Sequence, residues 1–170
     1  MKKNISIFLL GIFLLGGCAT HSYTDGPPSI GAIYSKYAQI GYEGDLRPIG
    51  DIGIVTTDGI VKVRQLNGRP MESFRLFKAA SLFPGGRYQL HLLPGAYELA
   101  LAFRFDNGSG SISWSTSDLT KSIIVTKGQV LHLSWIGRGR SSWGVQEFDG
   151  SSALATITDD FEKLTKKKPE

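Results

Sequence analysis

The sequence predicts a mainly β fold, an antiparallel β-sandwich of about seven strands with a short helix before it and a second helix at the C-terminus. Three observations lead to this prediction. After Gly50 the chain consists of short β-branched and aromatic runs separated by glycines, as strands and tight turns require. Over residues 88–105 apolar and polar side chains alternate with a period of two, which buries one face of each strand. A length of 170 residues suits a single domain.

The N-terminal segment, residues 1–17, has the layout of a secretory signal peptide. Two lysines are followed by an apolar run, two glycines and Cys18, which is the single cysteine of the chain. The apolar run is shorter than the roughly 20 residues that span a bilayer. The alternatives are an ordinary secretory signal or a membrane-spanning helix in which the cysteine stands by chance.

The segment Leu15-Gly16-Gly17-Cys18 resembles the lipobox of bacterial lipoproteins. The resemblance implies that the chain is cut before Cys18, that the Cys18 sulfur carries diacylglycerol and that the new amine is acylated. Three acyl chains should hold the protein on a membrane that it does not cross. Ala19 stands where an aspartate would be the usual inner-membrane retention signal. The resemblance therefore implies the periplasmic face of the outer membrane.

The segment after the cysteine is expected to be a flexible tether over residues 18–28, because small polar residues and paired prolines bury too little apolar surface to fold. Apolar residues then recur at helical spacing over residues 29–40. Ser29 is a suitable N-cap and Gly41 a suitable C-terminal stop, which predicts a short amphipathic helix packed against the domain. The β-sandwich domain is expected over residues 41–160.

The first strands of the domain are expected over residues 52–55 and 60–66, joined by the turn pair Asp58-Gly59. Asn67-Gly68 forms a second pair of the kind that favours a turn with positive φ. A strand, a turn and a strand are thus predicted before the middle of the chain.

Two antiparallel hairpins are predicted next. The first joins the alternating runs 88–92 and 97–105 through a turn at Pro94-Gly95. The second spans residues 121–136 and turns at Lys127-Gly128. Each hairpin should place one apolar face in the core and the other face toward solvent or a second sheet.

The C-terminal part is expected to contain a last strand over residues 143–148 and an edge strand over residues 153–157. Residues 158–164 should close the domain as a helical turn. Four lysines then lie within residues 161–170, which are expected to form a solvated basic tail.

Three motifs resemble small β-sandwich domains of the PEGA and carboxypeptidase-regulatory type. They are Val63–Pro70, Leu93–Leu99 and Thr126–Leu131. Gly41–Pro48 also resembles a segment, with the pattern Y-x-G-x-x-R-P, that opens the domain in small envelope lipoproteins. The resemblance covers about residues 41–136 and implies a transthyretin-like or Ig-like sandwich. It implies no specific activity, because its motifs describe turns and strands.

Patterns that carry catalysis or bind metals are absent from the sequence. The one thiol is assigned to lipid attachment, and no Gly-x-Ser-x-Gly elbow occurs. His91 and His132 stand opposite the apolar alternation of their strands, where a surface or inter-sheet hydrogen bond is the ordinary role. No histidine, cysteine or carboxylate spacing matches a known metal site. We therefore expect a chain that is not an enzyme and that needs no cofactor or metal.

Two segments are candidates for binding a partner. Residues 71–87 are an insertion relative to the resembled domains, and they carry a hydrophobic set in which Phe74, Phe77 and Phe83 are the candidate contacts. The alternative is that these residues fill the mouth of the sandwich or add a strand.

The second candidate segment is a glycine-containing basic loop that ends in an aromatic residue. Its Arg138, Arg140 and Trp143 could stack on a sugar ring or hydrogen-bond an anionic polymer. The alternative is a solvated hairpin tip.

These features favour an outer-membrane lipoprotein that serves as a non-enzymatic binding or structural accessory component of the cell envelope, with an envelope protein as its partner. The first alternative is a peptidoglycan- or carbohydrate-binding module built on Trp143 and its neighbouring arginines. The second alternative is an enzyme whose catalytic residues are distant in the sequence and come together only in the folded chain. A nucleic-acid partner is not expected, because the formal net charge of +4 includes two lysines of the signal.

Overall fold

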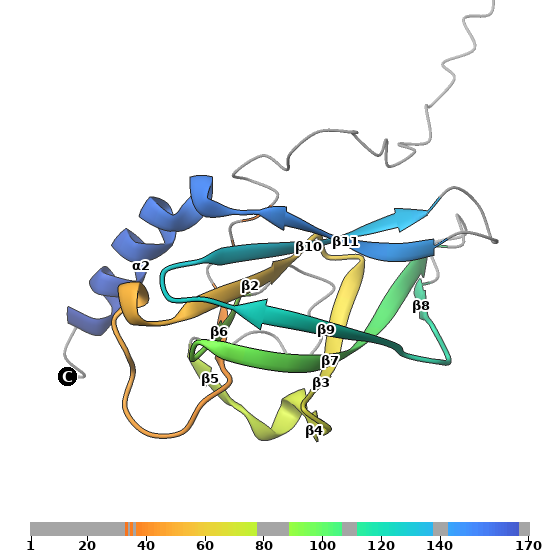
Figure 1. Cartoon of the computed structure of the whole chain (residues 1–170), viewed down its shortest axis with the longest axis horizontal. Coiled ribbons are helices and arrows are strands. Elements are labelled where there is room, and N and C mark those ends of the chain that lie inside the picture. The colour runs from red at the N-terminus through yellow and green to blue at the C-terminus, as the bar shows by residue number, and fades with distance from the viewer. Residues whose placement is uncertain are drawn as a thin grey trace, which may run out of the picture.

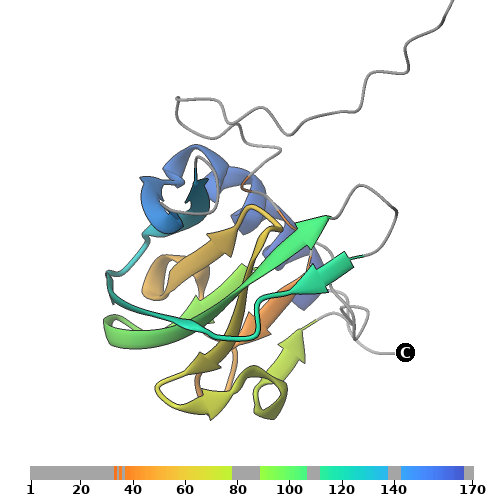
Figure 2. The same ribbon diagram turned by 90° about the vertical axis from the view of Figure 1, so that its right-hand side faces the viewer.

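The computed structural model describes Ile33, Ser35 and residues 37–77, 89–106, 112–137 and 143–166. Within these residues eleven strands form two sheets, and an α-helix follows the last strand. The sheets lie face to face, and the helix covers the outer side of one of them (Figure 1; Figure 2). The predicted mainly β class with a C-terminal helix is confirmed, although the strands outnumber the seven or so expected from the sequence.

The larger sheet has six strands in the order β11-β10-β2-β6-β1-β5. Their bounds are Ala38–Ile40 (β1), Gly53–Thr57 (β2), Arg75–Phe77 (β5), Gln89–Leu92 (β6), Val130–Gly137 (β10) and Trp143–Asp149 (β11). β1 pairs in parallel with β6, and β10 pairs in parallel with β2. The larger sheet is therefore mixed, whereas the sequence predicted an antiparallel fold.

The smaller sheet has five strands. Four of them follow the order β4-β3-β7-β8, and β9 also pairs with β7. Their bounds are Val61–Leu66 (β3), Arg69–Pro70 (β4), Gly95–Asp106 (β7), Ile112–Trp114 (β8) and Leu119–Val125 (β9). All pairs in this sheet are antiparallel.

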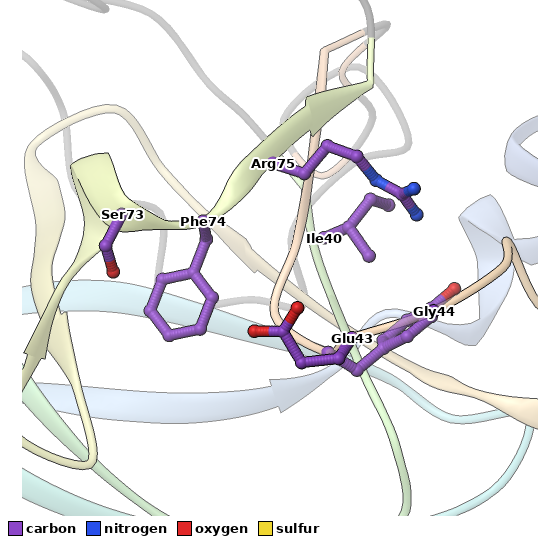
Figure 3. Close-up of a pocket in the computed structure, with 7 residues that line it drawn as sticks. Ile40, Glu43, Gly44, Ser73, Phe74 and Arg75 are labelled. Carbon is purple, nitrogen blue, oxygen red and sulfur yellow. The ribbon is translucent and has the colours of Figure 1, made fainter.

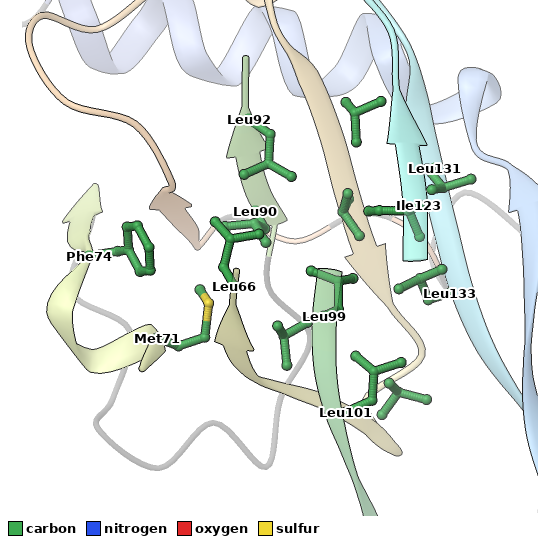
Figure 4. Packing of buried hydrophobic residues seen from close by; sticks show 14 of the residues in the cluster. Leu66, Met71, Phe74, Leu90, Leu92, Leu99, Leu101, Ile123, Leu131 and Leu133 are labelled. Atoms are coloured by element: carbon green, nitrogen blue, oxygen red, sulfur yellow. The ribbon is translucent and has the colours of Figure 1, made fainter. Parts of the chain in front are cut away.

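The larger core cluster lies between the two sheets. Leucine side chains of β3 and β7 pack against leucines of β6 and β10, as Figure 4 shows. The labelled members are Leu66, Leu99 and Leu101 on one side and Leu90, Leu92, Leu131 and Leu133 on the other. Gly53 permits this close approach, because a Cβ there would lie 2.0 Å from Val125 Cγ1 and 2.8 Å from the Thr126 carbonyl oxygen.

A smaller core cluster lies on the outer face of the six-stranded sheet. The short η1 (Ile49–Asp51), η3 (Ser151–Ala153) and the helix α2 (Leu154–Lys166) surround it. Ala153, Ile157 and Phe161 recur every four residues and point one face of the helical segment into this cluster. Both faces of the larger sheet are therefore covered in its central part.

The predicted hairpins at Pro94-Gly95 and Lys127-Gly128 are wrong. β6 belongs to the larger sheet and β7 to the smaller one, and β9 and β10 are divided in the same way. The chain also changes sheets between β2 and β3. Alternation with a period of two identifies a strand with one buried face, but it is the same for a hairpin and for a crossing between packed sheets.

Two local predictions are confirmed. Asn67 and Gly68 both adopt positive φ, at 49° and 75°, and they join β3 to β4 as a two-residue hairpin turn. The last predicted strand is β11, which pairs antiparallel with β10 in seven consecutive positions from Leu131↔Asp149 to Gly137↔Trp143.

The helix predicted over residues 29–40 is wrong at its C-terminal end. Ile33 is helical and fully buried, but Ala38–Ile40 form β1, with Ala38 and Ile40 buried and Gln39 half-buried. The strand is stabilised by pairing with β6 on one side and β5 on the other, which are distant in sequence. Tertiary pairing of this kind overrides a helical spacing of apolar residues.

The predicted C-terminal arrangement is also corrected. Residues 153–157 do not form an edge strand, because η3 and α2 occupy them. The expected tail over residues 161–170 is helical as far as Lys166, and Phe161 is buried. The apolar residues of this segment have a spacing of four, which fits a helix face better than a strand.

Candidate functional site

A pocket of about 260 Å³ opens at the β5 edge of the larger sheet (Figure 3). It is half open to solvent and combines apolar, aromatic and charged side chains of both signs. The lining residues are Ile40, Tyr42, Glu43, Gly44, Ser73, Phe74 and Arg75.

The pairing register of β1 and β5 positions the side chains of Ile40 and Arg75. Ile40 of β1 lies opposite Arg75 of β5 in an antiparallel pair, so the two side chains share one side of the sheet. After β1 the chain turns at Gly44, whose φ of 85° favours glycine. The buried Tyr42 fixes this turn, because its hydroxyl oxygen accepts a hydrogen bond from the Arg47 backbone N–H at 3.0 Å.

The other wall comes from the short helix η2 (Met71–Ser73). The Phe74 N–H donates to the Met71 carbonyl oxygen at 3.1 Å and closes this turn. Ser73 Oγ donates to the Pro70 carbonyl oxygen at 2.7 Å. The Gln39 side-chain amide also donates to the Met71 carbonyl oxygen, which ties η2 to β1. The pocket wall is therefore held by hydrogen bonds within the fold.

Charged groups stand on opposite walls. Arg69 Nη1 lies 3.6 Å from Glu43 Oε1, and the Arg69 guanidinium lies over the Phe74 ring, 4.5 Å from its centroid. Arg75 is exposed, and within the described ranges no carboxylate forms an ion pair with it. The pocket thus contains a guanidinium that is available for an anion.

The phenylalanines predicted to bind a partner have different positions. Phe74 is only 9% exposed and belongs to the larger core cluster, so this ring fills the mouth between the sheets while its edge lines the pocket. The alternative of an additional strand is also realised, as β5. Phe77 ends β5, but its side chain lies outside the described part, as does all of Phe83.

The other predicted site residues fall largely beyond the described ranges. Cys18, Arg138 and Arg140 lie outside them. Trp143 begins β11 opposite Gly137, and its side chain is not among those described. Neither the lipid attachment nor the basic loop is therefore tested by the structure.

Both histidines of the strands are buried, so of the two expected roles the surface position is wrong, and their hydrogen bonds with Gln89 and Thr56 lie within one sheet instead of between sheets. They lie on the outer face of the larger sheet, and each is 1% exposed. Burial lowers the pKa of His91 to about 4, and its Nε2 lies 3.0 Å from Gln89 Oε1. His132 Nδ1 forms a 2.8 Å hydrogen bond with Thr56 Oγ1. The alternation of apolar and polar residues along these strands does not show that Ile33 and α2 cover the outer face of the sheet.

We expect opposite effects from the same substitution at two adjacent threonines. Thr57 Oγ1 is buried and has no hydrogen-bond partner in the described part of the molecule, so Thr57→Val should raise the free energy of unfolding by about 1 kcal/mol. Thr56→Val should lower it by about 1–2 kcal/mol, because it removes the hydroxyl that is hydrogen-bonded to His132 Nδ1. Urea denaturation followed by tryptophan fluorescence measures both. Equal signs would contradict the hydrogen-bond assignment.

Sequence reasoning missed Tyr42, Glu43 and Arg75 as pocket residues. Tyr42 and Glu43 lie in the Gly41–Pro48 segment, whose sequence pattern indicates only the start of the domain. Arg75 lies in the insertion. Their association depends on the β1–β5 register, which joins residues 35 and more positions apart. No local pattern indicates such a pairing.

Among the described residues no helix is long and apolar enough to cross a membrane. The same ranges contain no group of three or more histidine, cysteine, aspartate or glutamate side chains that could hold a metal ion. Comparisons of the chain with protein-family models, with curated proteins and with solved structures found no match.

Proposed function

We propose that the chain is an outer-membrane lipoprotein, anchored through Cys18 on the periplasmic face, and that its folded domain is a non-enzymatic binding component of the cell envelope. The lipobox-like sequence supports the anchor. A pocket with a guanidinium available for an anion supports the binding role. Tethering at the membrane raises the effective concentration of the domain for envelope partners without requiring new contacts.

The observation that carries the binding role is the separation of the histidines from the pocket. A general base must come within about 3 Å of the proton that it takes. His91 and His132 are sealed in the core. The Ser73 hydroxyl donates to the Pro70 carbonyl oxygen, and the Glu43 carboxylate in the pocket lining is paired with Arg69. The pocket lining combines a carboxylate, a guanidinium and an aromatic ring, which are groups that recognise a charged ligand.

We also propose that the two sheets form a transthyretin-like sandwich. The shared core between the sheets supports this proposal, as do the motifs Val63–Pro70 and Leu93–Leu99. The parallel pairs β1–β6 and β2–β10 and the helix α2 are additions to the simplest form of such a fold.

The anchor is tested by two single substitutions near the signal. In cells labelled with radioactive palmitate, the native chain should incorporate label and Cys18→Ser should not, because the acylated thiol is missing. Ala19→Asp should keep the label but move the protein from the outer to the inner membrane in a sucrose gradient. Label in the Cys18→Ser variant would refute the anchor, and an unchanged position of Ala19→Asp would refute the sorting assignment.

A further inference from the structure

The Arg75 guanidinium is the first of three features that define a ligand for the pocket. It lies above Ile40 in Figure 3, on an exposed edge strand, and no described carboxylate pairs with it. An arginine presents a planar fork of donors that matches a carboxylate in two parallel hydrogen bonds. Arg75 and Glu43 both line the pocket, so a ligand that carries charges of both signs can meet a partner for each of them there.

The second feature is Glu43 on the opposite wall. In Figure 3 the Ile40 side chain lies between the Arg75 guanidinium and Glu43. Arg69 holds the Glu43 carboxylate through a contact of 3.6 Å. The side chain of Glu43 is 87% exposed, so this ion pair is weak and leaves oxygen lone pairs for a second cation or donor.

The third feature is size. A volume of about 260 Å³ is below the usual range of pockets for drug-sized ligands, which is about 300–1,000 Å³. An amino acid or a dipeptide fills such a space. A longer chain could enter only with its end.

We infer that the pocket binds the free carboxylate end of a short peptide. The carboxylate pairs with the Arg75 guanidinium, an ammonium or N–H group of the ligand faces Glu43, and its small side chains lie along the exposed edge of the Phe74 ring. This inference rests on the proposed binding role and names its ligand class. The ligand is either the C-terminus of a protein or a cell-wall peptide, since both present the same group.

Calorimetric titration of the detergent-solubilised mature lipoprotein tests the inference with defined probes. L-Ala-L-Ala represents a protein terminus and D-Ala-D-Ala a cell-wall peptide. At least one should bind, and its C-terminal amide should bind about tenfold more weakly, because one charged partner is lost. N-acetylation should weaken binding to a smaller extent, since the Glu43 side chain is 87% exposed and its ion pairs are screened by solvent.

Substitutions in the pocket test which residue binds each end of the dipeptide. Arg75→Gln should weaken binding of the free acid about tenfold and should no longer distinguish the acid from its amide. Glu43→Gln should no longer distinguish the free amine from its acetylated form. Lys127→Gln and Glu72→Gln, exposed and outside the pocket, should bind as the native protein does.

Three outcomes would overturn the inference: no binding of either dipeptide, equal binding of acid and amide by the native protein, or retained discrimination in Arg75→Gln. None of them affects the lipid anchor, which the palmitate experiment tests separately. A native fold of each variant is checked by near-ultraviolet circular dichroism, and little change is expected because Arg75 and Glu43 are exposed.

Discussion

Replacing Asp58 with alanine is expected to lower the free energy of unfolding by about 4 kcal/mol, the largest effect of a single side chain that we predict. One carboxylate oxygen accepts from the backbone N–H groups of Ile60 and Val61 at 2.8 and 3.0 Å. The other accepts from Ser134 Oγ at 3.0 Å and from the Trp135 N–H at 2.7 Å. Asp58 therefore ties the crossing from β2 to β3 to strand β10.

The magnitude follows from the charge of the acceptor. Hydrogen bonds to a charged group are each worth about 1.5–3 kcal/mol, and bonds that share one carboxylate do not add in full. Asp58→Asn should lose about half as much as the alanine variant, because its single carbonyl can serve one side only and its amide meets a donor on the other. The prediction is measured as the midpoint and slope of urea denaturation.

Asp118→Ala is the matched control. The Asp118 carboxylate also forms an ion pair, with Arg64 Nη1 at 3.1 Å, but both side chains are a quarter or more exposed. Its removal should cost at most about 1 kcal/mol. If Asp58→Ala were no more destabilising than this control, the role of Asp58 in joining the two sheets would be refuted.

The behaviour of Asp58-Gly59 illustrates what the sequence could predict about this fold. The pair predicts a turn, and Gly59 has the expected positive φ of 85°. The turn carries the chain from one sheet to the other, however, and the carboxylate contacts on β10 lie more than 70 positions away. Local chemistry identified the turn and its flanking strands, while the partners of those strands depend on packing that no short pattern describes.

The same limit applies to the candidate site. Phe74 could be selected from the sequence because an aromatic cluster in a connecting segment is conspicuous, but its burial between the sheets could not. Glu43 and Arg75 are ordinary charged surface residues in isolation. They acquire significance only because β1 pairs with β5 and places them around Ile40. A binding site whose residues are brought together by the pairing of distant strands can therefore be found in the structure but not in the sequence alone.

Acid is expected to destabilise the protein through His91. Burial lowers the pKa of this imidazole from 6.5 to about 4 in the folded state. Between these values the unfolded chain takes up a proton that the folded chain excludes, so lowering the pH favours unfolding. The effect is negligible at pH 7.5 and amounts to about 2–3 kcal/mol at pH 4.5. Urea denaturation at pH 7.5 and pH 4.5 measures it.

The environment of His91 explains why the proton is excluded. Its neighbours on the adjoining strands are Ile40 and Ile54, and the Phe161 ring of α2 lies 5.7 Å from the imidazole. Each of these side chains is uncharged, and the Nδ1 atom has no hydrogen-bond partner among the described residues. A charged imidazole would thus be buried without compensation.

His91→Leu separates this effect from the titration of carboxylates. The substitution leaves Gln89 Oε1 without its partner, a cost that is equal at both pH values. Asp149 and Glu162, whose pKa values are lowered by hydrogen bonds from Ser151 and Lys166, lose their contribution in acid in both proteins. The native protein should therefore lose about 2–3 kcal/mol more than the variant between pH 7.5 and pH 4.5. Identical losses would show that His91 accepts its proton inside the fold.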